Sequence, residues 1–154
     1  VFLLHISFTA RLVYENILAR RQRYSVPNKT GNRTLASRLM PLTGTLLIAY
    51  LISHVLDYRL NPITDANSMV DGVNLGLYGL VYNSFLSPIR SAWYIIAMIA
   101  VGFHLVHAIQ SVMQTFGFNH KVYTPLIQKV SLIVGIGLSA GFATIPLYVY
   151  FLGM

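Results

Sequence analysis

Residues 91–117 read SAWYIIAMIAVGFHLVHAIQSVMQTFG and contain no charged side chain. A helix that crosses a bilayer needs about 20 mostly apolar residues, which this run supplies. The segments between Arg38 and Asp57 and from Val130 to the end of the chain are also uncharged. Overall, 55% of the residues are hydrophobic and 10% are charged, whereas a soluble domain needs a more polar surface. The sequence therefore predicts an all-α membrane protein.

Four spans are predicted, which together form a transmembrane helical bundle and a single domain over residues 1–154. Gly117 is the expected stop of the third span, and Thr124-Pro125 is expected to open the fourth. Val1 opens directly into an apolar run without a polar leader, so we expect the chain to begin inside a helix, with a segment missing before it. The expected bounds of the spans are 1–23, 35–58, 91–117 and 125–153.

A longer polar connection runs from Arg59 to Arg90. Apolar residues recur within it at three- and four-residue spacing, which predicts a short helix lying in the membrane interface. Those residues are Leu75, Tyr78, Val81, Tyr82 and Phe85. Trp93 and Tyr94 follow at the start of the third span, where aromatic rings favour the headgroup region.

The net charge of +7 arises from eleven Lys and Arg against four Asp and Glu. Basic residues gather in loop 20–38, namely Arg20, Arg21, Arg23, Lys29, Arg33 and Arg38. Basic loops mark the cytoplasmic side of membrane proteins, so this loop indicates orientation and not nucleic-acid binding. The turn that holds Lys121 and Lys129 then lies on the same side. The absence of cysteine excludes thiolate metal sites and cysteine-ligated clusters within this chain.

Four histidines lie within or near the spans: His5, His54, His104 and His107. A histidine in hydrocarbon is costly unless it is paired or liganded, so each is a candidate functional residue. Two neutral imidazoles from different helices can hold a haem iron when they lie at similar depth. The alternative is a neutral imidazole hydrogen-bonded to a neighbouring helix. A zinc site is less favoured, because no acidic residue or cysteine within a span completes the ligand set.

The depth of each histidine in the bilayer decides which of them can ligate the same haem iron. His5 and His104 are both expected in the inner half of the bilayer, so they can ligate one haem. His54 lies near the outer end of its span, just before Asp57, and no other outer-half histidine is present to pair with it. His107 follows His104 on nearly the same helix face, as an alternative ligand or as a hydrogen-bonding neighbour.

Several short sequences around these histidines occur in one order along nearly the whole chain. They are Leu4-His5 before the basic helix end, Leu42-Thr43-Gly44 before His54, Phe103-His104 followed by Gln110-Ser111 and Thr115-Phe116-Gly117, and the stretch from Asn119-His120-Lys121 to Tyr123-Thr124-Pro125. On these residues the chain resembles the cytochrome b membrane anchor of succinate:quinone oxidoreductases, the succinate dehydrogenase and fumarate reductase complexes. It is most similar to the type with one dihaem polypeptide.

The resemblance implies five spans, with one haem-ligating histidine in each of the first four. His5 matches the ligand of the second family span, His54 that of the third and His104 that of the fourth. The proximal haem b would then lie between His5 and His104, and His54 would serve a distal haem b. The partner of His54 belongs to the first family span, which this sequence lacks. Another membrane chain is one possible source of that span.

The resemblance also implies the partners. These are an iron–sulfur subunit and a flavoprotein subunit with FAD, which carries the dicarboxylate chemistry that this chain lacks. The quinone substrate is expected near His54, with menaquinone considered first and ubiquinone left open. Arg38 and Lys121 are expected to contact haem propionates or the iron–sulfur subunit, and the alternative is ordinary positive-inside charge. The expected location is the bacterial inner membrane.

Two other functions remain open at this point. One is the cytochrome b anchor of another respiratory enzyme, such as a hydrogenase or a formate dehydrogenase, which also uses histidines on several spans. The other is a transporter or a structural membrane subunit without haem. A transporter is expected to show an internal repeat, and the glycine-rich segment Gly135–Gly141 has no counterpart elsewhere in the chain.

Overall fold

A computed structural model describes residues 1–19 and 35–153 of the chain. The chain divides into two compact units, Val1–Thr34 and Leu35–Met154, and each is treated by itself. In the first unit, helix α1 covers Phe2–Ala19. Arg11 Nε donates to Glu15 Oε1 at 2.7 Å, one helical turn away, and both side chains are exposed. The second half of α1 is therefore polar, as its sequence predicts.

Three helices among the described residues are long and apolar enough to cross a membrane, and the chain is accordingly a membrane protein. They cover Leu35–Arg59, Pro88–Thr115 and Tyr123–Leu152. Helix α1, the first predicted span, is not among them, because Arg11, Glu15 and Asn16 interrupt its apolar character. A fourth span thus stays a prediction. The basic residues 20–33 of the loop lie outside the described residues, and Arg38 lies in the first turns of α2.

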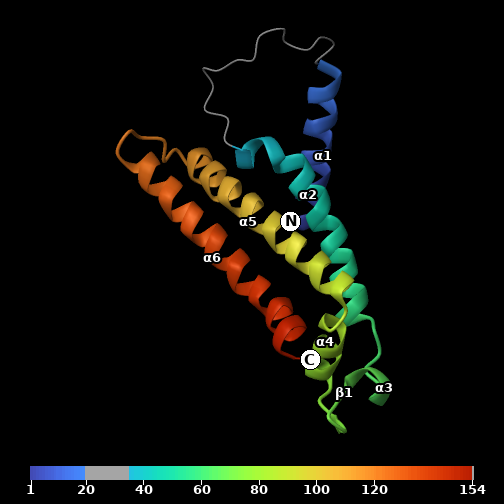
Figure 1. Ribbon diagram of the computed structural model, residues 1–154. Coiled ribbons are helices and arrows are strands. Elements are labelled where there is room, and N and C mark those ends of the chain that lie inside the picture. The colour runs from blue at the N-terminus through green and yellow to red at the C-terminus, as the bar shows by residue number, and fades with distance from the viewer. Residues whose placement is uncertain (20–34, 154) are drawn as a thin grey trace. The chain divides into compact units, whose positions relative to one another are not determined.

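The second unit contains all the remaining elements (Figure 1). Helix α5 packs against both α2 and α6, so it is the central helix of the unit. Successive spans run antiparallel, which gives the unit a "turn end" at residues 116–122 and a "loop end" at residues 60–87. The elements are α2 (Leu35–His54), its π-helical continuation η1 (Val55–Arg59), α3 (Asp65–Ser68), β1 (Met69–Val70), β2 (Val73–Asn74), α4 (Leu77–Phe85), α5 (Pro88–Thr115) and α6 (Tyr123–Leu152).

Gly117 ends α5 as predicted. It adopts a left-handed conformation with φ of 86°, which glycine adopts without a Cβ clash. Its N–H donates to the Gln114 carbonyl, and the Phe118 N–H donates to the Met113 carbonyl, each at 3.0 Å. These two bonds form a Schellman motif, which satisfies carbonyls that the helix end would otherwise leave unpaired.

The starts of α5 and α6 differ from the predicted bounds. Helix α5 begins at Pro88, before Arg90, because proline fits the first helical position, where no N–H is needed. Helix α6 begins at Tyr123, and the predicted cap, Thr124, lies inside the helix. The Thr124 hydroxyl instead accepts a hydrogen bond from the His120 N–H at 3.2 Å.

Helices α5 and α6 approach closely along a stripe of small residues. At Gly135 an added Cβ would lie 2.9 Å from the Gly102 carbonyl oxygen, so only glycine permits this separation. Polar contacts flank this crossing on both sides: Ser139 Oγ donates to the Met98 carbonyl at 2.6 Å, and Gln110 Nε2 donates to Ser131 Oγ at 2.8 Å. The contact residues recur every fourth position on each helix, at Met98, Gly102, Val106 and Gln110 on α5 and at Ser131, Gly135 and Ser139 on α6.

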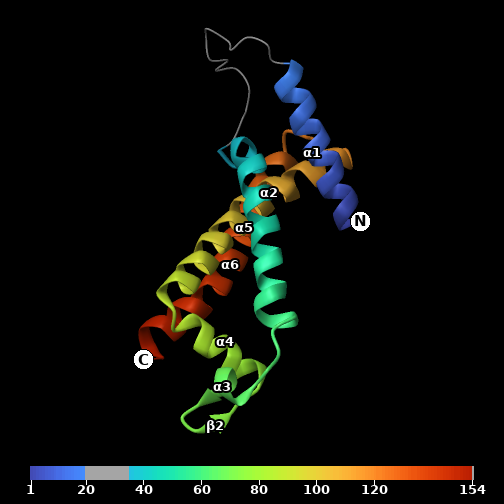
Figure 2. The same ribbon diagram turned by 90° about the vertical axis from the view of Figure 1, so that its right-hand side faces the viewer.

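The loop end is a small folded layer (Figure 2). Strands β1 and β2 pair antiparallel through Asp71 and Gly72, both at positive φ, which is the geometry of a tight hairpin turn. Helix α4 confirms the predicted short helix. Its Phe85 is buried with Tyr94 and Val149, so α4 packs on the bundle and does not only lie along the membrane surface. The prediction omitted α3 and the hairpin, although Asp71-Gly72 is a typical turn signal.

Candidate functional site

His104 lies on α5 opposite Thr43 of α2, and a hydrogen bond joins the two side chains. The Thr43 Oγ1 to His104 Nδ1 distance is 3.2 Å, and Thr43 is only 4% exposed. Thr43 also donates its single hydroxyl proton to the Met40 carbonyl one turn earlier, at 3.2 Å. When the hydroxyl donates to Met40, the threonine oxygen accepts from His104; in a neutral ring this places the proton on Nδ1 and the lone pair on Nε2.

This tautomer is the one that a metal-ligating histidine uses. A ligating imidazole coordinates through one nitrogen while the other donates a hydrogen bond that fixes the ring orientation. Gly44 lies next to the same ring, where an added Cβ would be 3.7 Å from His104 Cε1. The chemistry of His104 and the small neighbour at Gly44 therefore fit the axial ligand of a haem.

His54, the second predicted ligand of this unit, is exposed on α2 and surrounded by tyrosine rings. Its ring centroid lies 5.5 Å from that of Tyr50, 5.3 Å from that of Tyr58 and 6.1 Å from that of Tyr94. No side-chain hydrogen bond to His54 occurs within the described residues. An exposed imidazole with aromatic neighbours can take a planar ligand from its open side, provided that a second ligand is supplied.

The helix changes form immediately after His54. Residues Val55–Arg59 are π-helical, with the Leu60 N–H bonded to the Val55 carbonyl at 2.9 Å. Within this turn, Asp57 faces α5: Tyr94 donates its hydroxyl to Asp57 Oδ2 at 3.1 Å, and Arg90 Nη1 donates to Oδ1 at 3.0 Å. Single π-turns occur frequently at functional sites. This one fixes the end of the helix that carries His54.

Sequence reasoning missed this Asp57–Tyr94–Arg90 contact. Tyr94 is 5% exposed and Trp93 Nε1 donates to Ser53 Oγ at 2.9 Å, so both side chains face α2. Their expected depth in the headgroup region stays a prediction. The sequence did contain one signal for this contact: Asp57 is an acidic residue at the end of an apolar helix, where it needs a polar or basic partner.

His54 and His104 lie at two different levels of the unit. His104 lies beside Thr43, whereas His54 lies beside Tyr94. Thr43 and His54 are eleven positions apart on α2, which corresponds to roughly 16 Å along a helix. Two side chains so separated do not ligate one iron. The geometry therefore agrees with separate sites for the two histidines.

The remaining predicted residues are placed as follows. His5 lies on α1, in the other unit, so its pairing with His104 stays a prediction. His107 is half-buried on α5, and no hydrogen bond to its ring occurs within the described residues. Arg38 and Lys121 are both exposed at the turn end, the former on α2 and the latter between α5 and α6.

His120, interpreted as a surface residue, is exposed in the same turn. Its Nδ1 accepts from the Val122 N–H at 3.2 Å, so the ring has a local structural role. No group of three or more His, Cys, Asp or Glu within the described ranges is arranged to hold a metal ion.

Comparison of the chain with known protein families, with curated proteins and with solved structures gives no match.

Proposed function

We propose that this chain is the haem b-binding membrane anchor subunit of a succinate:quinone oxidoreductase, which passes electrons between an iron–sulfur subunit and a membrane quinone. The observation that carries the proposal is the hydrogen bond between Thr43 and the Nδ1 of His104, because a partner at one ring nitrogen is the arrangement that orients a metal-ligating histidine. The resemblance described above supplies the identity of the complex. The resemblance assigns the dicarboxylate chemistry to the flavoprotein subunit.

In this proposal His104 and His5 hold the proximal haem and His54 holds one side of a distal haem. A haem with two histidine ligands carries single electrons and leaves no open axial site for oxygen. Thr43 keeps the His104 ring in its ligating tautomer and orientation, and Gly44 leaves space beside it. The two levels of His104 and His54 then place two carriers in sequence across the membrane.

The turn end is the cytoplasmic side in this arrangement. Helix α1 is a further span, the first along the chain, the basic loop 20–38 lies in the cytoplasm, and Arg38 and Lys121 are available to haem propionates or to the iron–sulfur subunit. A flavoprotein subunit with FAD completes the complex in the bacterial inner membrane. Quinone, with menaquinone considered first, reacts at the loop end near His54.

The test of the proposal is an optical difference spectrum of the purified membrane protein, reduced with dithionite minus oxidised. We expect the sharp α-band of a b-type haem with two histidine ligands, together with reoxidation of this band when a quinone is added. The absence of any haem band in protein produced with an adequate haem supply would rule out the proposal.

A second candidate is a membrane subunit without haem, in which the histidines serve only helix packing. The same Thr43–His104 bond favours it, since interhelical hydrogen bonds also stabilise bundles without cofactors. This candidate predicts no haem band. It also predicts that substituting His104 lowers the thermal stability without changing any spectrum.

Replacing Thr43 with valine separates a ligand-orienting role from simple packing. Valine retains the shape of threonine but cannot bond to His104 Nδ1. Substituting a residue that orients a metal ligand typically lowers the metal affinity 10–100-fold. We therefore expect about a tenfold loss of haem affinity in Thr43→Val, measured by titrating haem into the protein depleted of it.

Two matched variants accompany this measurement. Thr43→Ser retains the hydroxyl and should retain the wild-type affinity for haem. Thr45→Val makes the same change two positions along α2, at an exposed threonine bonded only to the Pro41 carbonyl. If Thr43→Val and Thr45→Val bind haem equally well, Thr43 does not orient the ligand.

A further inference from the structure

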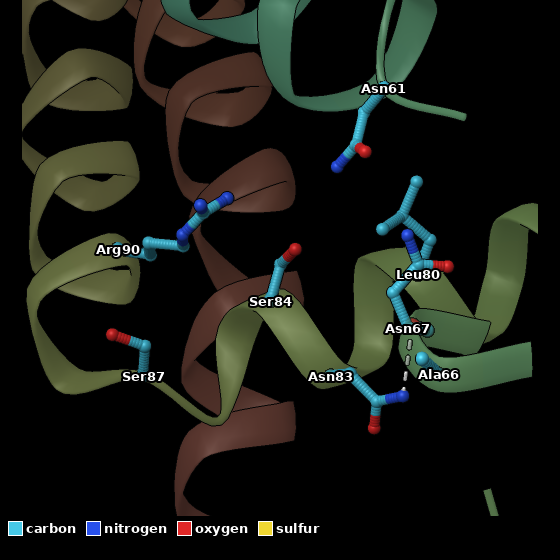
Figure 3. Close-up of a pocket in the computed structure, with 8 residues that line it drawn as sticks. All are labelled: Asn61, Ala66, Asn67, Leu80, Asn83, Ser84, Ser87 and Arg90. Carbon is cyan, nitrogen blue, oxygen red and sulfur yellow. Dashed lines mark hydrogen bonds between the residues drawn. The ribbon is translucent and has the colours of Figure 1, made fainter. Parts of the chain in front are cut away.

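An open cavity of about 320 Å³, lined by both polar and apolar surface, lies at the loop end, between the start of α5, helix α4 and the segment that follows η1 (Figure 3). This volume lies at the lower end of the range for small-molecule sites. Seven of the eight lining residues are Asn, Ser, Ala or Arg, and Arg90 is the only charged one. The lining residues are Asn61, Ala66, Asn67, Leu80, Asn83, Ser84, Ser87 and Arg90.

Part of this polar lining is already committed to the fold. Asn67 Oδ1 accepts from the Thr64 N–H at 2.9 Å, and its Nδ2 donates to the Pro62 carbonyl at 2.9 Å. Asn83 Nδ2 donates to the carbonyls of Asn67 and Met69. These two amides are therefore walls of the cavity and not its binding groups.

Two side chains retain donors that the fold does not use. Within the described residues no hydrogen bond to the side chain of Asn61 is present, and Arg90 uses only Nη1, toward Asp57. Ser84 differs, because its hydroxyl interacts with the Tyr58 hydroxyl. Figure 3 shows the side chains of Asn61, Ser84 and Arg90 converging on the cavity from the segment after η1, from α4 and from α5. A guanidinium with an amide is a donor-rich pair, and it suits an anion with several acceptor oxygens.

The surroundings of the cavity distinguish a lipid from a free anion. The apolar residues next to its lining are strongly exposed: Ile89 precedes Arg90 and is 80% exposed, Leu60 precedes Asn61 and is 65% exposed, and Ile63 is 49% exposed. The cavity also lies where α5 enters its apolar run, which is the depth of lipid headgroups. The phosphate of a lipid could bind the donors in the cavity, and its hydrocarbon tails could cover the exposed apolar residues beside it.

We propose that this cavity binds the phosphate of a phospholipid headgroup from the leaflet at the loop end, with Arg90 and Asn61 as donors. Among the described residues Asp57 is the carboxylate that contacts Arg90, and it competes with the phosphate for the guanidinium. The site is distinct from the haem sites, and its test needs no haem signal.

Native mass spectrometry of the full-length chain in mixed micelles tests the site, with phosphatidylglycerol as the probe. Galactosyl diacylglycerol, which has the same tails and no phosphate, is the comparison lipid. We expect one phosphatidylglycerol to bind to the wild type preferentially over the galactolipid. Arg90→Gln should weaken this binding about tenfold, the typical effect of one hydrogen bond to a charged group. Asn61→Ala should weaken it by a smaller factor.

Two further variants distinguish binding from a structural effect. Asp57→Asn releases Arg90 from its carboxylate partner, so it should strengthen phosphatidylglycerol binding, opposite to Arg90→Gln. Arg59→Gln removes an exposed charge at the same end that does not line the cavity, and it should leave binding unchanged. If Asp57→Asn weakens binding as much as Arg90→Gln, or if Arg59→Gln matches Arg90→Gln, the proposal is wrong.

Inorganic phosphate distinguishes the two sources of the anion. Failure of millimolar phosphate to displace phosphatidylglycerol supports a lipid site that requires both the headgroup and the tails. Binding of inorganic phosphate in an Arg90-dependent manner without retention of phosphatidylglycerol overturns the lipid assignment. Equal retention of the galactolipid and phosphatidylglycerol overturns the proposal as a whole.

Discussion

The His104→Ala variant should lose the b-type α-band of the proximal haem while the protein still inserts and folds. In the proposed function alanine removes one of two haem ligands, and loss of a ligand should exceed the 10–100-fold effect typical of residues that only orient one. His104 lies where α2 packs on α5, with its Nδ1 bonded to Thr43, so the ring position is set by both helices. The measurement is haem content per chain by pyridine haemochrome, together with the reduced-minus-oxidised spectrum.

His107→Ala is the matched control for this experiment. His107 lies one turn along the same helix and is also half-buried, so both substitutions remove the same side chain from similar surroundings. We expect His107→Ala to retain at least most of the haem. A result in which His107→Ala loses the band and His104→Ala retains it would assign the ligand to His107. Equal retention in both variants would remove this part of α5 from haem binding.

The Gly135→Val variant should lose much of the stability of the α5–α6 pair. A Cβ at Gly135 would lie 2.5 Å from Val106 Cγ2 and 2.9 Å from the Gly102 carbonyl oxygen, so the helices must separate to accept it. Overpacking costs about 1–3 kcal/mol and occasionally more. We expect an effect at the upper end of that range, because the obstacle includes backbone as well as a side chain. The measurement is the free energy of unfolding in mixed micelles.

Gly137→Val provides the control, two positions further along the same helix. An added Cβ at Gly137 meets nothing within 4 Å in the described part of the chain. Both substitutions change intrinsic helix propensity in the same way. The difference between the two free energies of unfolding therefore measures the helix contact alone. Equal losses in both variants would show that the close approach at Gly135 contributes nothing to stability.

The spans of the second unit could be predicted from the sequence because their signal is local. Uncharged runs of sufficient length mark α2, α5 and α6, and Gly117 marks a helix end through a conformation that other residues avoid. The start of α5 was missed because Arg90 was taken as a boundary. A charge can enter the first turn of a span when a partner such as Asp57 neutralises it.

Contacts between helices could not be predicted in the same way. The spacing of Ser131, Gly135 and Ser139 shows a face of small residues, but nothing local identifies Gly102 as the residue opposite. Likewise, His104 was a candidate ligand from its place in an apolar span. The role of Thr43 depends on a side-chain contact across 61 positions, which spacing does not reveal. The candidate residues were thus predictable, and their orientation was not.

The ladder of contacts between α5 and α6 has a consequence for the order in which this protein assembles. Ser139 donates to the Met98 carbonyl of α5 and Gln110 donates to Ser131 of α6, so these two donors find their partners only when the two helices are together. The Ser131 hydroxyl donates within α6, to the Gln128 carbonyl. Each helix alone would therefore expose Ser139 or Gln110 to lipid. We expect the two helices to enter the membrane as a hairpin, closed by the short turn after Gly117. Helix α2, made earlier on the ribosome, would then join a completed surface. His104 would form its hydrogen bond with Thr43 only at that last step. In the proposed function, the His104 ring would therefore be oriented for haem only after α2 has packed against α5.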